Sequence, residues 1–267
     1  VYSQLSSRRA HGLFQNATEK GQISHAPNFN QPSILFRNPE ITPILHELVT
    51  LSALPVAGIE VDFAVDSTGF RTTTFSAYNG IKHGQKKEHH WVKAHLCAGV
   101  KTNVVAAVAI TDENGGDSPQ FGPLVKKTAE GFKINEVSAD LAYSSRLNLQ
   151  LVANEGGKTY IPFKKNATGK ARGSMLWSKM YHYFQLNRDD FMEHYHKRSN
   201  IEATNAAIKR KFGETLKSKN PVAQINELLA KIIAYNLTVV IHEMYENGIQ
   251  PEFLQIKSDV CKRSPSF

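Results

Sequence analysis

Hydrophobic and polar positions follow a strand-like pattern through the first half of the chain after residue 58. Apolar residues alternate with polar or small ones in one run, Ile59, Val61, Phe63 and Val65, which is the period-two pattern of a strand. Ser67-Thr68-Gly69 predicts the end of this strand or a bend in it. Two more apolar runs, 90–100 and 104–111, predict further strands, and the short connections favour an antiparallel meander.

The pattern then changes to alternating helices and strands. Ser118 followed by Pro119 predicts a helix start, and Ser144 or Ser145 predicts another. The predicted elements of this half are a helix at 121–130, a strand at 135–140, a helix ending at 154, a strand at 158–163, and helices near 174–184, 189–194, 199–211 and 221–246.

This order of elements predicts an α/β fold. Three antiparallel strands followed by alternating helices and strands give a mixed five-stranded sheet with helices on both faces and a helical C-terminal part. The order resembles the ribonuclease H-like fold. The sequence predicts one such domain at 56–247, followed by a loose tail at 248–267.

Residues 1–55 carry weaker signals. Only Ile41, Leu45, Leu48 and Leu51 fit a helical face, ending near Pro55. We interpret 1–55 as a lead-in or the remnant of a preceding DNA-binding module.

Charge and composition narrow the class of partner and the compartment. The 267 residues include 32 Lys and Arg against 24 Asp and Glu, for a net charge of +8, which favours a polyanionic partner such as nucleic acid. Two cysteines form no disulfide framework, so a reducing cytoplasm is expected. The chain shows no signal-peptide pattern and no apolar run of about 18 residues, so no membrane partner is expected.

Two aspartates fall at predicted strand ends. Asp66 lies late on the first strand, and Asp140 ends the fourth, which is expected beside it. A helix packed over the sheet could bring Glu202 to the same point. Three clustered carboxylates need a cation, and hard ions such as Mg²⁺ or Mn²⁺ prefer oxygen ligands. Two such ions roughly 3.5–4 Å apart can drive in-line phosphodiester displacement.

The segment Tyr195–Lys209 holds four residues at regular spacing. On one continuous helix, Tyr195, Arg198, Glu202 and Lys209 would form a single narrow stripe suited to a phosphate backbone beside a metal ligand. The alternative is a solvated helix face whose start is a capping box, with Ser199 as N-cap and Glu202 reaching back to it. If Ser199 is the N-cap, Tyr195 and Arg198 instead lie in the turn before the helix.

Each acid also has a structural explanation. Asp66 could cap its own turn, and Asp140 could only begin a loop. Glu60 and Asp62 share the strand face of Asp66 and compete for its role. Loop or capping roles are favoured for Asp112 and Asp117, and a zinc site is disfavoured for the histidines, His83, His89, His90 and His95.

Taken together, these motifs resemble those of DDE transposases of bacterial insertion sequences. Asp66 lies in Val-Asp-Ser-Thr-Gly, Asp140 in Ala-Asp-Leu-Ala-Tyr, and Glu202 in Tyr-x2-Arg-x3-Glu-x6-Lys. The resemblance covers about residues 59–245, and 90–95 also resembles the second strand of the family.

The resemblance implies metal-dependent cleavage of double-stranded DNA at element ends and 3'-hydroxyl strand transfer into target DNA. Asp66, Asp140 and Glu202 would hold two Mg²⁺ or Mn²⁺ ions. Arg198 and Lys209 would contact phosphates, and Tyr195 would contact the backbone. Whether the chain acts as a homodimer on DNA is left open by the sequence.

Two other functions are consistent with the same residues. One is a related metal-dependent nuclease that does not transpose, and the other is a catalytically inactive DNA-binding protein.

Trp177 could grip a flipped base, although a packed core position is favoured for it.

Overall fold

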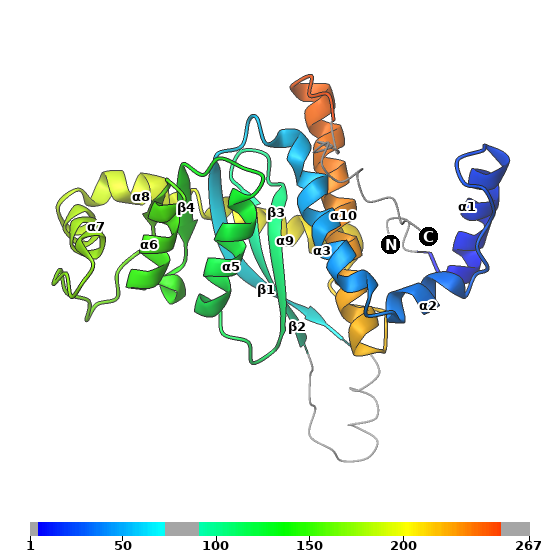
Figure 1. Ribbon diagram of the computed structural model, residues 1–267, viewed down its shortest axis with the longest axis horizontal. Coiled ribbons are helices and arrows are strands. Elements are labelled where there is room, and N and C mark those ends of the chain that lie inside the picture. The colour runs from blue at the N-terminus through cyan, green and yellow to red at the C-terminus, as the bar shows by residue number, and fades with distance from the viewer. Residues whose placement is uncertain (1–4, 73–90, 252–267) are drawn as a thin grey trace, which may run out of the picture.

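A single mixed sheet of five strands organises the chain (Figure 1). The computed structural model describes residues 5–72 and 91–251. The strands are β1 (Asp62–Arg71), β2 (Trp91–Gly99), β3 (Val105–Asp112), β4 (Glu136–Ala139) and β5 (Lys158–Tyr160). Their order is β3-β2-β1-β4-β5, in which β1, β2 and β3 pair antiparallel, β4 pairs with β1 in parallel, and β5 pairs with β4 in parallel. The predicted α/β class and the mixed five-stranded sheet are confirmed.

Strand β1 is longer than its sequence predicts. Ser67-Thr68-Gly69 does not end it, because β2 pairs with it along its whole outer half, from Ser67 opposite His95 to Arg71 opposite Trp91. Backbone pairing to a neighbouring strand overrides the local preference for a turn. Asp66 therefore lies in the middle of β1 rather than at its end.

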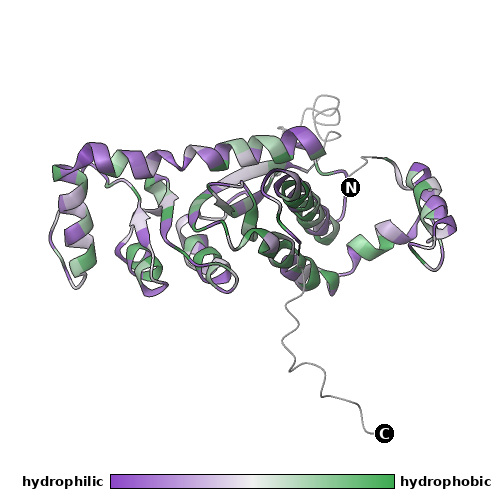
Figure 2. Ribbon diagram, turned by 90° about the horizontal axis from the view of Figure 1, so that it is seen from above, coloured by the Kyte–Doolittle hydropathy of each residue, from purple (hydrophilic) through white to green (hydrophobic). Residues whose placement is uncertain are grey.

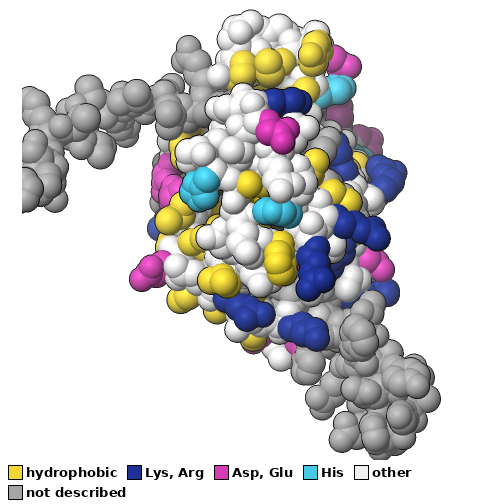
Figure 3. All heavy atoms as spheres, turned by 90° about the vertical axis from the view of Figure 1, so that its right-hand side faces the viewer, with side chains coloured by type: hydrophobic (Ala, Val, Ile, Leu, Met, Phe, Trp, Pro, Cys, Tyr) yellow, Lys and Arg dark blue, Asp and Glu magenta, His cyan; other side chains and the backbone are white. Residues whose placement is uncertain are grey.

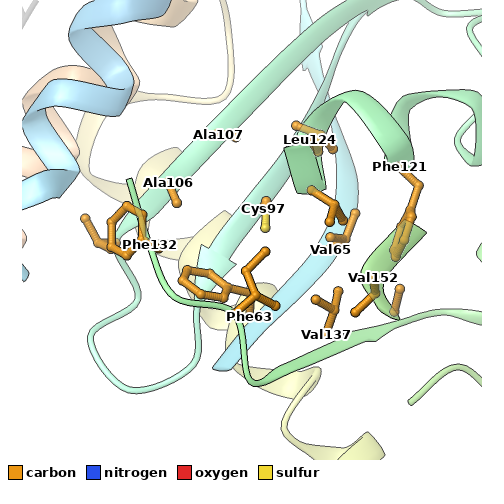
Figure 4. Close-up of a cluster of buried hydrophobic side chains, with 14 of the residues drawn as sticks. Phe63, Val65, Cys97, Ala106, Ala107, Phe121, Leu124, Phe132, Val137 and Val152 are labelled. Carbon is orange, nitrogen blue, oxygen red and sulfur yellow. The ribbon is translucent and has the colours of Figure 1, made fainter. Parts of the chain in front are cut away.

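One face of the sheet packs on helices α5 (Ser118–Ala129) and α6 (Arg146–Asn154). Val65 of β1 lies beside Leu124 of α5 in this core, and Phe63 and Phe121 belong to the same cluster, as Figure 4 shows. The α6 start follows the predicted capping, since Ser145 Oγ accepts the Asn148 amide at 3.1 Å.

The opposite face packs on α9 (Ser199–Phe212) and α10 (Pro221–Glu246). Ala64 of β1 and Leu96 of β2 contact this layer, through Ile201 and Ile208 of α9 and Leu228 of α10. Because Ala64 and Asp66 alternate with Phe63 and Val65, Asp66 faces α9. Helices therefore cover both faces of the sheet.

Helix α10 is long and apolar enough to cross a membrane by length and composition alone. It lies beside α3 (Ile41–Ala53), and both ribbons are largely hydrophobic in Figure 2. More than half of its apolar stretch is buried inside the molecule. Asn236 supports this packing, because its side-chain amide donates to the backbone carbonyls of Val49 and Val105 at 3.2 and 2.8 Å.

A satellite cluster lies beyond β5, where α7 (Met175–Leu186) and α8 (Arg188–His196) meet α6. Trp177 is 6% exposed and packs against Phe163 there. Its indole nitrogen donates to the Thr168 carbonyl at 2.9 Å, and the Arg146 guanidinium lies over its ring. These contacts are those of a packed core tryptophan.

The N-terminal part contains more structure than the sequence pattern indicates. Besides the predicted helix, which is α3, it forms α1 (Ser7–Glu19) and α2 (Gln31–Arg37). Neither α1 nor α2 has a buried residue, although α1 is amphipathic. Two short 3₁₀ segments, Leu54–Val56 and Leu141–Tyr143, complete the elements of the described residues.

Candidate active site

The sheet register places the two predicted aspartates next to each other. Val65 pairs with Ala139 in the parallel ladder between β1 and β4, so Asp66 and Asp140 follow at the same level. Asp140 comes directly after β4, where its Oδ1 accepts the Ala142 amide at 2.6 Å. Asp140 is thus also the N-cap of the next short helix.

Helix α9 crosses above these two carboxylates. The Arg198 Nη1 atom lies 4.0 Å from Asp66 Oδ2, and Arg198 Nη2 forms a close ion pair with Glu202 Oε1. Asn205, one turn after Glu202, donates through Nδ2 to Asp66 Oδ2 at 3.4 Å. The structure therefore brings Asp66, Asp140, Arg198 and Glu202 into one neighbourhood, with Arg198 between Asp66 and Glu202.

The pKa of Asp66 reflects this crowding. Burial raises the pKa of the Asp66 carboxyl above its usual value, and the negative charges of Asp140 and Glu202 raise it further. The Ser67 amide and the Arg198 charge oppose this shift without cancelling it. The Asp66 side chain is 21% exposed, whereas that of Glu202 is 57% exposed. Asp66 is therefore a carboxylate whose burial is only partly compensated.

The Arg198 guanidinium responds to the same charges. Burial alone lowers the pKa of Arg198, but the electrostatic effects of Tyr195, Glu202, Asp66 and Asp140 raise it overall. These four groups therefore share one electrostatic environment with Arg198.

Lys209 lies apart from the acids. Its ammonium group sits 5.5 Å from the centre of the Phe70 ring, at the far end of β1. Burial lowers the pKa of Lys209, and its charged neighbours are Glu214 and Arg71 rather than the three candidate acids. Segment 195–209 thus follows β1 lengthwise, with Lys209 beyond the carboxylates.

The junction before α9 differs from both sequence interpretations. Helix α8 ends at His196, and residues 197 and 198 keep helical dihedral angles into α9. Ser199 is therefore not an extended N-cap, and its hydroxyl donates to the His196 carbonyl at 3.0 Å. The predicted capping box is wrong, because Glu202 pairs with Arg198 instead. Tyr195 lies in the last turn of α8 and Arg198 at the junction, so the four residues do not share one helix.

The competing acids have structural partners. Glu60 is 1% exposed and accepts from the Thr102 amide and hydroxyl at 2.7 and 2.9 Å. Asp62 is bound by Lys197, and Asp112 caps the Asn114 amide at 3.0 Å.

Asp117, considered for a capping role, and His95, considered for zinc, also have protein partners. Asp117 pairs with Lys93 at 2.6 Å, and His95 is buried against Asp117 and Thr111. The other histidines considered for zinc, His83, His89 and His90, lie outside the described residues.

The carboxylate oxygens of Asp66, Asp140 and Glu202 suit a hard cation, but the three side chains do not converge on a common position. Within 5–72 and 91–251, no three His, Cys, Asp or Glu side chains are close enough to hold a metal ion as they stand. The Arg198 guanidinium instead lies between Asp66 and Glu202. Next to Asp66, the buried Asn205 Oδ1 atom has no hydrogen-bond partner among the described residues. Carboxylate and amide oxygens are the ligands that Mg²⁺ and Mn²⁺ prefer.

Comparison with known families decides the relationship. The pattern of the Transposase DDE domain family matches residues 58–237, about two thirds of the chain. This chain belongs to the Transposase DDE domain family. The matched range contains β1 to β5 and extends into α10, so it includes all the acids discussed above.

A relative supports the family assignment. The chain is similar to a probable transposase for insertion sequence element ISA1214 from Archaeoglobus fulgidus, with 27% identity over 206 residues. The match covers 77% of this chain and 62% of that relative, so the chain spans less than two thirds of the transposase it matches.

Sequence reasoning overlooked two residues around this DDE-domain site. Asn205 follows Glu202 by three residues, a helical spacing that places both on one face of α9. Lys197 immediately precedes Arg198, but its partners lie on β1 and β4, more than 60 residues away along the chain. No local pattern in the sequence indicates such partners.

Proposed function

We propose that this chain is the catalytic part of an insertion-sequence transposase with a ribonuclease H-like fold. It cleaves double-stranded DNA at element ends and joins the freed 3'-hydroxyl to target DNA. The observation that carries the proposal is that Asp140 and Glu202 lie close enough to Asp66 to raise its pKa, all within the family-matched range, with Arg198 between Asp66 and Glu202.

Asp66, Asp140 and Glu202 would hold divalent metal, with two Mg²⁺ or Mn²⁺ ions expected. The metals would supply Lewis-acid activation of the attacking water or hydroxyl and neutralise the leaving oxygen. Support comes from the raised pKa of Asp66, since burial disfavours its charged form and a cation would restore it.

The neighbouring cations would bind the DNA backbone. Arg198 presents a planar fork that suits a phosphate once metal takes its place on Glu202. Lys209, further along β1, would contact a second phosphate, and Tyr195 would contact the backbone before the junction. The net charge of +8 favours the same polyanionic partner, and Lys and Arg side chains gather on the end face shown in Figure 3.

A cleavage assay tests the proposal. Purified protein is incubated with labelled duplex carrying the element ends, with and without Mg²⁺ or Mn²⁺, and then with a pre-cut 3' end and target DNA. We expect metal-dependent cleavage and joining. Asp140→Asn and Glu202→Gln should each slow cleavage by about 10³-fold or more, because a metal contributes several kcal/mol and about 1.4 kcal/mol is tenfold.

Three outcomes would contradict the proposal. Cleavage that survives both substitutions unchanged would show that the site is elsewhere. Hydrolysis without joining would indicate a nuclease that does not transpose. Duplex binding without any cleavage would indicate a DNA-binding protein whose acids are structural.

A further inference from the structure

A second pair of carboxylates lies on the same face of β1 and β4 as the candidate site. Asp62 and Glu136 are direct partners in the parallel ladder, each four residues before Asp66 or Asp140. Because side chains four residues apart on a strand project to the same face, both pairs face α8 and α9. The ladder runs from the Asp62–Glu136 pair to the pair Val65–Ala139, and Asp66 and Asp140 lie one position beyond it.

Lys197 binds this second pair. Its Nζ atom lies 2.8 Å from Asp62 Oδ2 and 2.8 Å from Glu136 Oε2. Burial lowers the pKa of Lys197, but its hydrogen bonds to both carboxylates raise it overall, so the ammonium stays charged. The three side chains are between 11% and 32% exposed.

Other side chains complete the cluster. Asn135 donates to the second oxygen of Asp62 at 2.8 Å, and His194 Nδ1 lies 2.9 Å from Glu136 Oε2. The His194 ring stacks on Tyr160 of β5, with 4.3 Å between ring centres. The end of α8 is thereby attached to β1, β4 and β5 together.

Lys197 and Arg198 are consecutive residues at the junction between α8 and α9. One binds the lower carboxylate pair, and the other lies beside Asp66 and Glu202. No side-chain hydrogen bond caps the start of α9, and Lys197, whose ammonium binds Asp62 and Glu136, lies two residues before its first residue.

We propose that Lys197 is a positioning residue, which clamps the α8–α9 junction to Asp62 and Glu136 and so sets Arg198 and Glu202 over Asp66 and Asp140. The inference rests on the proposed function of those acids. Lys197 touches neither DNA nor metal in this role. A displacement of about 1 Å at a reacting group can cost on the order of 100-fold in rate, so a clamp outside the site can control it.

Lys197→Met tests the clamp because it keeps the length of the side chain and removes the charge. The chain offers a control in Lys127, whose Nζ also lies 2.8 Å from two carboxylates, Glu47 Oε1 and Glu130 Oε2, but these carboxylates are 61% and 62% exposed. Lys127→Met therefore removes a lysine that bridges two carboxylates far from the candidate site. Lys197→Arg restores the charge, and Asp62→Asn/Glu136→Gln/Lys197→Met removes the whole charged cluster.

Two measurements are made on each variant. Single-turnover cleavage at saturating DNA and Mn²⁺ reports the chemical step. Hydrogen exchange of the peptide covering 195–205, without DNA or metal, reports the order of the junction directly. Thermal unfolding monitors stability in parallel.

We expect Lys197→Met to slow cleavage by about 100-fold and to increase exchange in 195–205. Lys127→Met should cleave within about threefold of wild type, since exposed ion pairs contribute little. Lys197→Arg should recover most of the rate. The triple variant should recover the thermal stability that Lys197→Met loses, because no carboxylate of the cluster is left uncompensated. It should still cleave DNA slowly.

The inference is overturned if Lys197→Met cleaves like Lys127→Met, or if the triple variant cleaves like wild type. In the second case, the lysine would only neutralise its partners. A wild-type protein that does not cleave would refute the proposed function instead. The exchange measurement would still decide whether Lys197 orders the junction, because it needs neither substrate nor metal.

Discussion

The two carboxylate pairs on β1 and β4 differ in how their charges are compensated. In the lower pair, Asp62 and Glu136 share an ammonium at hydrogen-bond distance, with Asn135 and His194 as further partners. In the upper pair, the nearest cation to Asp66 among the described residues is Arg198, whose Nη1 lies 4.0 Å away and whose Nη2 pairs with Glu202. The same residue type on the same strand face is therefore satisfied at one level and crowded at the next.

This difference supports the proposal that Asp62 and Glu136 are structural acids and that Asp66 is a functional one. A carboxylate with full partners stabilises the fold, whereas an uncompensated one costs stability that only a ligand can return. Clusters whose charges are left unbalanced are typical of functional sites. Position on the strand alone does not distinguish Asp62 from Asp66, but the partners of each side chain do.

The largest expected effects are on stability, with opposite signs at the two levels. Asp62→Asn should lower the free energy of unfolding by about 1–3 kcal/mol, because Lys197 loses a charged partner. Asp66→Asn should instead raise the melting temperature at pH 7 by a smaller amount, because it removes a buried charge that is poorly compensated. Thermal unfolding of both variants in metal-free buffer measures the difference.

The pH dependence gives an internal control for Asp66. Its folded-state pKa is raised, so the folded protein binds the proton more tightly and loses stability as the pH rises from the ordinary aspartate range through the raised pKa. The advantage of Asp66→Asn should therefore be present at pH 7 and vanish below about pH 4, where both states are protonated. A stabilising effect of equal size at both pH values would contradict this explanation.

A smaller effect is expected at Arg198. Arg198→Ala should leave metal binding in place and lower by a few-fold the Mn²⁺ concentration that raises the melting temperature, because the guanidinium no longer competes for Glu202. DNA cleavage should slow, and the salt dependence of DNA binding should weaken by about one counterion if Arg198 holds a phosphate.

The matched control for Arg198 is Arg71, which pairs with Glu214 at 3.3 Å with half of its side chain exposed. Arg71→Ala should leave the Mn²⁺ dependence unchanged. If Arg198→Ala unfolds the protein or abolishes the metal-induced shift, Arg198 is a structural ion-pair partner rather than a competitor for the metal position.

The sequence predicts the parts of this molecule that depend on local pattern. The period of α10, the cap at Ser145 and the order of strands follow from neighbouring residues, and they place Asp66 beside Asp140. The continuation of β1 through Ser67-Thr68-Gly69 depends on pairing with β2, which overrides the turn preference. Helices α1 and α2 bury no residue, and α1 is polar on average despite its amphipathic face, so it resembles an irregular polar segment in the sequence.

The contacts of Lys197 show a different limit. Asp62 and Glu136 lie 135 and 61 residues from Lys197 along the chain. Nothing in the local sequence around either acid distinguishes it from an ordinary surface charge. The same limit explains the wrong capping box, since Ser199-x-x-Glu202 is a valid local signal. Arg198 offers Glu202 a stronger, charged partner than the backbone of Ser199 does.

The smallest expected effect concerns Ser199 and tests what fixes the start of α9. Because the exposed Ser199 Oγ donates to the His196 carbonyl and does not cap α9, Ser199→Ala should change the free energy of unfolding by less than about 0.5 kcal/mol. Ser145→Ala, which removes the true N-cap of α6, should cost about 1 kcal/mol. Urea unfolding of the two variants gives the comparison. Equal losses would mean that Ser199 caps α9 in solution, and the start of α9 would then not depend on the ion pairs of Lys197 alone.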